Sequence, residues 1–194
     1  MLVCLSTVNA DCEVPVRYST LEMVLDEQLR EIFVGELHIA RHLPRLVVDV
    51  SSSELKSQIG KALEQCHVRI ERLERLLKTR NLMVETAQSR VVDTLTKQAS
   101  EVVQHRGDDL LLDYGLVVIL RHLESYQKSV YESAREVANG LSVTDVAATL
   151  ELDLEDHGRM ERYFTVLEED MLDSIVARRG TNDKTRHPWE ATTR

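Results

Sequence analysis

The chain has 194 residues, which fits one domain with short tails and is long enough to bury a core. Its seven glycines and three prolines are too few for the frequent turns of an all-β sandwich. Aromatic residues make up 4% of the chain and the formal net charge is −9, so it lacks the stacking surface and the positive charge that favour nucleic-acid binding. We therefore expect a globular protein with no nucleic-acid partner.

Three cysteines, Cys4, Cys12 and Cys66, form no CxxC pair, and one would be left over from any disulfide. We expect them to be reduced, which is typical of a reducing compartment. The N-terminus carries no basic segment ahead of its short apolar stretch, which argues against a secretory signal. No run approaches the ~18 apolar residues that a membrane span needs, so the expected location is cytoplasmic, without a membrane partner.

Residues 1–19 lack apolar periodicity and are expected to form an N-terminal lead-in. Apolar residues then recur at helical spacing from Leu21 to Leu43, which predicts a first long helix. Pro44 follows at once, and because proline removes a backbone hydrogen-bond donor, we expect a kink or an early stop there.

The second long helix is expected to begin at Ser51–Glu54, where the Ser-x-x-Glu spacing is that of a capping box. Its apolar stripe continues to Leu77. Charged residues occupy the opposite face, which is expected to be solvated and to have no further role. They are Glu71, Arg72, Glu74 and Arg75.

A weaker apolar pattern covers residues 91–103 and stops at Gly107, which predicts a shorter third helix. Asp108 can cap the next helix, a long one whose apolar stripe ends at Asn139–Gly140. An Asn-Gly pair in that place is typical of a helix that closes in the left-handed conformation.

The last long helix is expected to start at Ser142–Asp145 and to end at Gly180, leaving a polar C-terminal tail over residues 180–194. The helical domain is thus expected to span residues 20–179. Two long helices, a shorter crossover helix and two more long helices form the layout of a ferritin-like four-helix bundle, so the predicted fold class is all-α.

Four ionisable side chains interrupt the apolar faces of three of these helices, and a buried charge costs several kcal/mol unless it is paired or bound to a metal. They are Glu36 in the first helix, Glu124 in the fourth, and Asp153 and His157 in the last. Asp153 and His157 are one turn apart and can therefore face the same point. We expect these groups to meet on the axis of the bundle.

Two interpretations of this convergence remain open. In the first, the carboxylates and the imidazole form a metal site, because these ligands suit iron, manganese or zinc. In the second, they form a satisfied polar core or lie at the edge of the bundle. A further pair, Glu64 and His67, has the Glu-x-x-His spacing of ferritin ligands, although Glu64 lies away from the apolar stripe of its helix.

Three segments resemble the YciE/YciF-type branch of the ferritin-like superfamily, within residues 25–172. The first is GELHIARHLPRL, in which the first helix runs into Leu-Pro. The second is SSSELKSQIGKALEQCHVRIERLERLL, and the third is HLESYQKSVYESA, which precedes the last helix. The resemblance implies a four-helix bundle with a crossover helix, often dimeric, in a bacterial group associated with stress.

The resemblance also implies positions for a di-metal centre. Glu36 falls on the first-helix glutamate of that centre, and Glu124 falls on the corresponding glutamate of the fourth helix. Asp156 and His157 fall on a pair of acidic residues, and a histidine in that position remains a competent ligand.

Other positions depart from the family pattern, because neutral or positive residues stand where acids or histidine are expected. They are Gln65, Arg69, Gln98 and Gln127. A neutral amide is a poor ligand for a divalent cation, and Arg69 brings a positive charge toward the site. A full di-iron oxidase is therefore not expected.

Two functional hypotheses follow. The first is a ferritin-like, stress-associated protein with a degenerate or single-metal site for iron or manganese and no firm catalytic activity. The ligands of that site would be Glu36, Glu124, His157 and Asp153. The second is a metal-free dimeric structural or interaction protein, in which Arg69 pairs with Glu36 or Glu124 and replaces the charge of the metal. No nucleophile or phosphate-binding motif is present, so the sequence identifies no small-molecule substrate.

Overall fold

The computed structural model describes residues 18–84, 89–105 and 107–184. Within these ranges the chain forms five helices and no strand, which confirms the predicted all-α fold. In chain order the helices are α1 (Leu21–Asp49), α2 (Ser53–Thr79), α3 (Arg90–Gln104), α4 (Asp109–Gly140) and α5 (Thr144–Lys184). Most of the predicted lead-in and tail, together with Cys4 and Cys12, lies outside the described residues.

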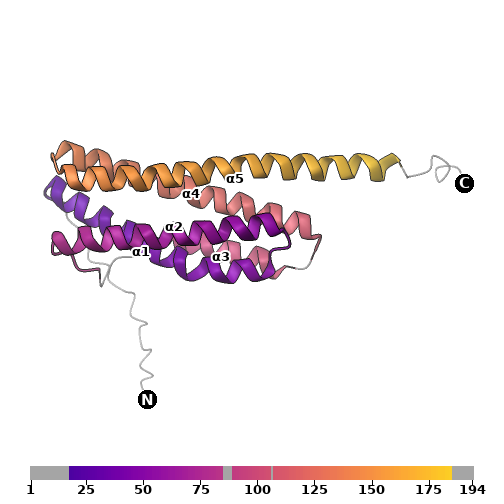
Figure 1. Cartoon of the computed structure of the whole chain (residues 1–194), viewed down its shortest axis with the longest axis horizontal. Helices are drawn as coiled ribbons and strands as arrows, with labels where there is room; N and C mark the ends of the chain where they lie inside the picture. Colours follow the sequence, from indigo (N-terminus) through magenta and orange to yellow (C-terminus); the bar gives the residue numbers. More distant parts are fainter. Residues whose placement is uncertain (1–17, 85–88, 106, 185–194) are drawn as a thin grey trace, which may run out of the picture.

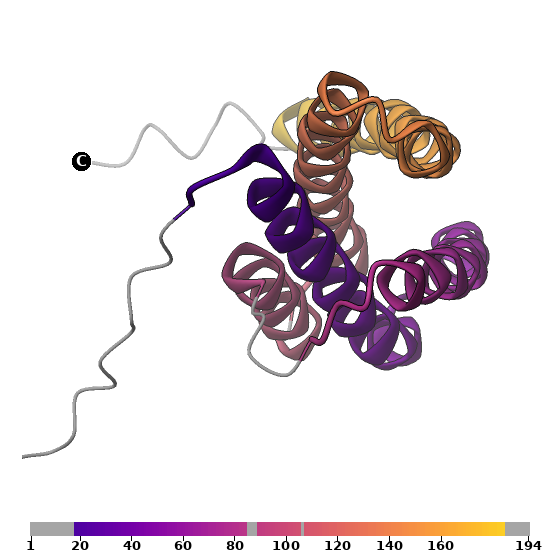
Figure 2. The same ribbon diagram turned by 90° about the vertical axis from the view of Figure 1, so that its left-hand side faces the viewer.

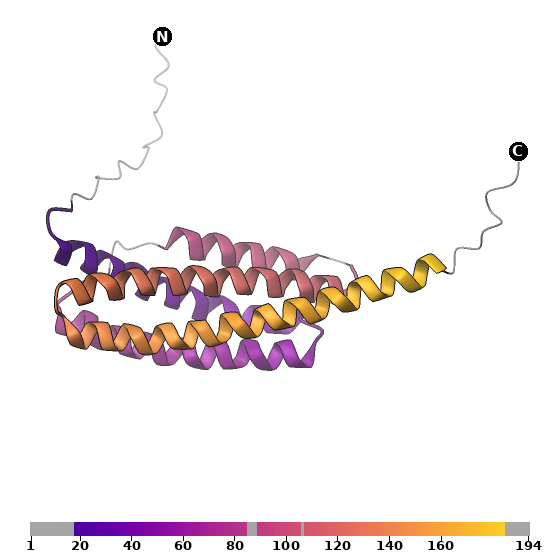
Figure 3. The same ribbon diagram turned by 90° about the horizontal axis from the view of Figure 1, so that it is seen from above.

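The four long helices run side by side, and α3 is the shorter crossover helix expected between the second and third of them (Figure 1). α1 packs mainly against α2, and α4 packs most extensively against α5. The crossover helix contacts α1 and α4 (Figure 2). α5 is the longest helix, and its C-terminal end projects beyond the other helices (Figure 3).

The core forms because each long helix carries an apolar stripe at helical spacing. Its fully buried members include Leu25, Leu29, Leu55, Ile59, Leu116 and Leu150. None of the described helices has the long apolar run that crossing a bilayer requires. The apolar stripes therefore face one another around a common interior.

Side chains cap three helices at their N-termini. Thr20, Ser52 and Asp108 accept hydrogen bonds from first-turn amides of α1, α2 and α4. The cap of α2 is one residue later than predicted, because Ser51 is held by Asp113 of α4. The carboxylate of Asp113 accepts from the Ser51 amide and hydroxyl, at 3.1 and 2.6 Å, and from the Ser52 amide at 2.8 Å. This buried aspartate therefore fastens the start of α2 to α4.

α1 continues through Pro44 to Asp49, so the early stop considered for this position does not occur. Proline inside a helix costs about 3 kcal/mol, because it removes one hydrogen bond and crowds the preceding turn. Leu43 and Leu46, on either side, are 3% and 1% exposed. Their burial contributes roughly 1.5–3 kcal/mol each, which offsets the cost of the proline.

The turn between α4 and α5 differs from the one predicted. α4 ends at Gly140, but the left-handed residue is Ser142, with φ of 58°. The amides of Ser142 and Val143 donate to the carbonyls of Asn139 and Ala138, at 3.0 and 2.9 Å. This is the hydrogen-bond pattern of a Schellman motif, and the turn is closed by a serine where glycine was expected.

Gly180 does not end the last helix, which continues to Lys184. A glycine ends a helix where it adopts a left-handed conformation, and no glycine in the described ranges has a positive φ. Gly180 accordingly stays helical.

Candidate functional site

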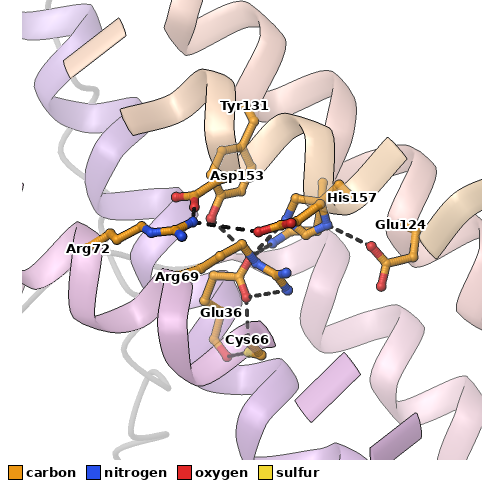
Figure 4. A network of polar contacts seen from close by, with 10 residues as sticks. Glu36, Cys66, Arg69, Arg72, Glu124, Tyr131, Asp153 and His157 are labelled. Carbon is orange, nitrogen blue, oxygen red and sulfur yellow. Dashed lines mark hydrogen bonds and ion pairs between the residues drawn. The ribbon is translucent and has the colours of Figure 1, made fainter. Parts of the chain in front are cut away.

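The four predicted site residues all lie inside the bundle, as their spacing predicts (Figure 4). Glu36 of α1 and both Asp153 and His157 of α5 are 0% exposed, and Glu124 of α4 is 8% exposed. Each lies on the buried, largely apolar face of its own helix, so the face that builds the core also carries these polar groups inward.

Glu36 is the centre of a buried hydrogen-bond network. Arg69 of α2 makes a bidentate contact with it: Nε donates to Oε1 at 2.9 Å and Nη2 donates to Oε2 at 3.1 Å. Oε1 also accepts from the Tyr131 hydroxyl at 3.0 Å and from the Gln127 amide at 3.3 Å. The Cys66 thiol donates to Oε2 at 2.9 Å. Both oxygens of this carboxylate are therefore fully engaged.

His157 bridges two carboxylates. Its Nδ1 lies 2.6 Å from Glu124 Oε2, and its Nε2 lies 3.0 Å from Glu36 Oε1. Burial and the charge of Arg69 lower the pKa of His157, but Glu124 and the hydrogen bonds with both carboxylates outweigh them and raise it. A neutral imidazole can donate from one nitrogen only, so both bonds are satisfied when the ring is protonated.

The network balances its own charge. Burial raises the pKa of Glu36, but Arg69 and His157 outweigh this and hold it well below its usual range. Arg69 keeps its proton, since its pKa is raised despite burial by the nearby Glu36. With His157 protonated, two cations face the two anions Glu36 and Glu124. The four groups therefore sum to zero without any added ion.

The neighbouring groups stay neutral. Burial, and then the charge of Glu36, raise the pKa of both Tyr131 and Cys66. The Tyr131 ring also packs against the ring of His157, with 4.9 Å between ring centroids. Cys66 and Tyr131 thus act as hydrogen-bond donors to Glu36 and are not sources of reactive anions.

Asp153 belongs to a separate ion pair. Arg72 Nη1 donates to Asp153 Oδ1 at 2.5 Å, and the Arg72 side chain is 26% exposed. The prediction that Arg72 has no role beyond a solvated face is therefore wrong, because its long side chain bends inward to reach a buried carboxylate. Burial raises the pKa of Asp153 to about 6, although Arg72 opposes the shift.

Several other candidates lie on the surface. Glu64, His67 and Gln65 are exposed residues of α2, and Gln98 is an exposed residue of α3. The Glu-x-x-His pair therefore contributes nothing to the interior. Gln127, in contrast, is 1% exposed and takes part in the network.

A di-metal centre does not fit this arrangement. A ligand atom needs a free lone pair, but both oxygens of Glu36 and both nitrogens of His157 are occupied by hydrogen bonds. The permanent charge of Arg69 contacts both oxygens of Glu36 and repels any positive ion at that carboxylate. In the described part of the chain, no three His, Cys, Asp or Glu side chains are arranged to hold a metal ion.

Comparison with known proteins gives consistent matches. The family described as Domain of unknown function (DUF892) matches residues 20–178. Protein YciF of Escherichia coli is 24% identical over 138 residues, which make up 71% of this chain and 83% of that protein.

Solved structures share the fold. The E. coli stress protein YciF superimposes with a TM-score of 0.76 at 22% identity, over 80% of this chain and 99% of that one. A structure from Bacillus anthracis, described as ferritin like, diiron-carboxylate proteins, gives a TM-score of 0.61 at 19% identity, over 78% and 99% of the two chains. Because the matched family covers most of the sequence, the chain belongs to the DUF892 family, and it shares the helical-bundle fold of these solved structures.

Proposed function

We propose that this protein is a metal-free, stress-associated helical dimer that acts as a structural or interaction protein and not as an enzyme. The observation that carries the proposal is the bidentate contact of Arg69 with Glu36. A guanidinium is never deprotonated in proteins, so it supplies permanently the positive charge that metal ions supply in a diiron-carboxylate bundle.

Electrostatics opposes a metal ion at Glu36. Two unit charges about 4 Å apart repel by roughly 4 kcal/mol at an effective dielectric constant of about 20, and a divalent ion doubles this. Displacing Arg69 instead would leave a buried charge without its partner, which costs about 3–5 kcal/mol. Whether the ion shares the site or displaces the guanidinium, binding is unfavourable.

Two further observations support the biological part of the proposal. The E. coli relative is described as a stress protein, which supports a stress association for this chain. Apolar side chains on the second half of α5 support a homodimer, since Val166, Leu172 and Val176 are 57%, 44% and 58% exposed.

A single-metal site is the second candidate, and one observation favours it. Glu124 gives only its Oε2 to His157, and the residue lines an open cleft between α2 and α5. Iron or manganese would then be held by Glu124, joined by His157 only if that ring loses a proton and gives up its Nδ1 hydrogen bond to Glu124, while Arg69 stays on Glu36.

Metal analysis separates the two candidates. Full-length protein is purified without chelators, loaded anaerobically with Fe(II) or Mn(II), desalted and analysed for metal. We expect substoichiometric metal, at the same level in the wild type and in Glu36→Ala/Glu124→Ala. A matched control, Glu64→Ala/Glu132→Ala, removes two exposed glutamates.

One metal per chain that is lost in Glu36→Ala/Glu124→Ala and kept in the control would overturn the metal-free proposal. Sedimentation velocity tests the dimer independently. A sample that stays monomeric across the micromolar range would remove that part of the proposal.

A further inference from the structure

A cleft of about 330 Å³ lies between α2 and α5, which contact each other only sparsely. This volume is within the range of small-molecule sites, about 300–1,000 Å³. The cleft descends to the buried network, because Arg69 and Glu124 line it together with the apolar side chains of Ala62 and Met160.

Each of the two network residues keeps one polar atom uncommitted. Arg69 bonds Glu36 through Nε and Nη2, and Glu124 bonds His157 through Oε2. Among the residues that the structure describes, Arg69 Nη1 and Glu124 Oε1 make no hydrogen bond, and neither is among the buried atoms sealed from solvent. In Figure 4 the guanidinium points toward the side of the network where Glu124 lies. The floor of the cleft thus offers one charged donor and one charged acceptor.

The charges that line the cleft are balanced. Three are positive and three are negative: Lys61, Arg69 and Arg159 against Glu64, Glu124 and Asp156. A simple anion drawn to Arg69 would meet Glu124, and a simple cation drawn to Glu124 would meet Arg69. Arg69 pairs with Glu36 and Glu124 pairs with His157, and they form no ion pair with each other, so a molecule that carries both charges can offer a partner to each of them.

We propose that this cleft binds a free α-amino acid, with its carboxylate on Arg69 Nη1 and its ammonium group on Glu124 Oε1. The side chain of the ligand lies along the apolar wall that Ala62 and Met160 form. This inference goes beyond the proposed structural role, because it gives the bundle a small-molecule ligand. It does not depend on whether the protein is a dimer.

A two-dimensional NMR titration of the full-length protein with L-methionine tests the proposal. Chelator is present throughout, so that metal binding cannot contribute to the result. The matched probes are 4-(methylthio)butanoate, which lacks the ammonium group, and 3-(methylthio)propylamine, which lacks the carboxylate. We expect saturable shifts for L-methionine with a dissociation constant of about 1 mM, and binding at least about tenfold weaker for both analogues.

Three variants locate the binding site. Glu124→Gln removes the charged acceptor and Met160→Trp fills the cleft, and each is expected to abolish the saturable shifts. Glu132→Gln, an exposed residue of α4, is expected to leave them unchanged. If Glu124→Gln does not fold, Met160→Trp alone decides the location.

The proposal is overturned by any of three results. These are no saturable shift with L-methionine, equal binding of either analogue, or full binding by Met160→Trp. If the protein binds both metal and L-methionine, the metal-free proposal fails and the amino-acid site stands. Failure of one proposal can therefore be told apart from failure of the other.

Discussion

Removing the cation from the centre of the network is the most direct test of its role. Arg69→Met keeps a long side chain but leaves Glu36, which is 0% exposed, without its bidentate partner. Breaking a buried ion pair costs about 3–5 kcal/mol, because the remaining charge is uncompensated. We expect the free energy of unfolding near neutral pH to fall by about that amount.

The loss should depend on pH in a defined direction. In the wild type the folded-state pKa of Glu36 is depressed, so its contribution to stability is present above its unfolded pKa and is lost only at strongly acid pH. In Arg69→Met the guanidinium no longer lowers the pKa of Glu36, so this carboxylate is protonated at a less acid pH than in the wild type, and protonation relieves the uncompensated charge. The difference in free energy of unfolding between variant and wild type should therefore shrink as the pH falls from neutral.

The assay is urea unfolding followed by far-UV circular dichroism, with two companion variants. Arg69→Met/Glu36→Gln removes both charges and should recover most of the loss. Arg75→Met makes the same change at an exposed position of α2 and should shift the free energy of unfolding by no more than about 0.5 kcal/mol. A loss below about 1 kcal/mol in Arg69→Met, or a double variant as unstable as the single one, would refute the idea that Arg69 balances Glu36.

Three further changes test other contacts by the same urea-unfolding assay. Tyr131→Phe removes a hydrogen bond donated to the ionised Glu36 and should lower the free energy of unfolding by about 1.5–3 kcal/mol; no change would mean that the hydroxyl bond is not formed. Asp113→Ala removes three hydrogen bonds that hold the start of α2 and should cost about 2–4 kcal/mol, with faster amide exchange in the first turn of α2 as its specific signature. Folding raises the pKa of His157. Its contribution to the free energy of unfolding is therefore fully present below the pKa of the unfolded state, and it is lost as the pH rises through the pKa of the folded state. His157→Gln should therefore flatten the fall in stability above about pH 6.5, and an unchanged slope would contradict the bridging role.

The helices and the inward position of the polar groups could be predicted from the sequence, because both follow from periodicity alone. Glu36 and His157 stand at helical spacing from core residues on both sides, and they are fully buried. The same spacing predicts only the face of a helix. It does not predict which side chains from other helices meet there.

The hydrogen-bond and ion-pair partners of the buried groups could therefore be identified only from the structure. The arginine at position 69 is consistent with a weakened metal site or with a replacement ion pair, and helical spacing alone does not show that its guanidinium reaches Glu36. Helical spacing places Arg72 on a solvated face, yet its flexible side chain reaches Asp153. Long cationic side chains lie up to several bonds from their backbone position, so helical spacing does not determine where their charge ends.

The helix ends, too, could be predicted only in part from the sequence. Glycine and proline mark the places where a helix can end, but the packing of the flanking residues decides whether it does. Ser142 adopts a left-handed conformation two residues after Gly140, although Asn139 and Gly140 are better suited to it on sequence grounds. The sequence signal located this turn to within a few residues and assigned it to the wrong one.

Each of the four long rods supplies one charge to the buried cluster: Glu36, Arg69, Glu124 and His157. Leucine stripes tolerate sliding, because one leucine can take the place of another a turn away. A slide of one turn moves a side chain by about 5.4 Å, which exceeds the reach of a hydrogen bond and strands a charge in an apolar interior. The buried charges therefore favour a single axial register of the four helices. Apolar surfaces alone do not provide this specificity.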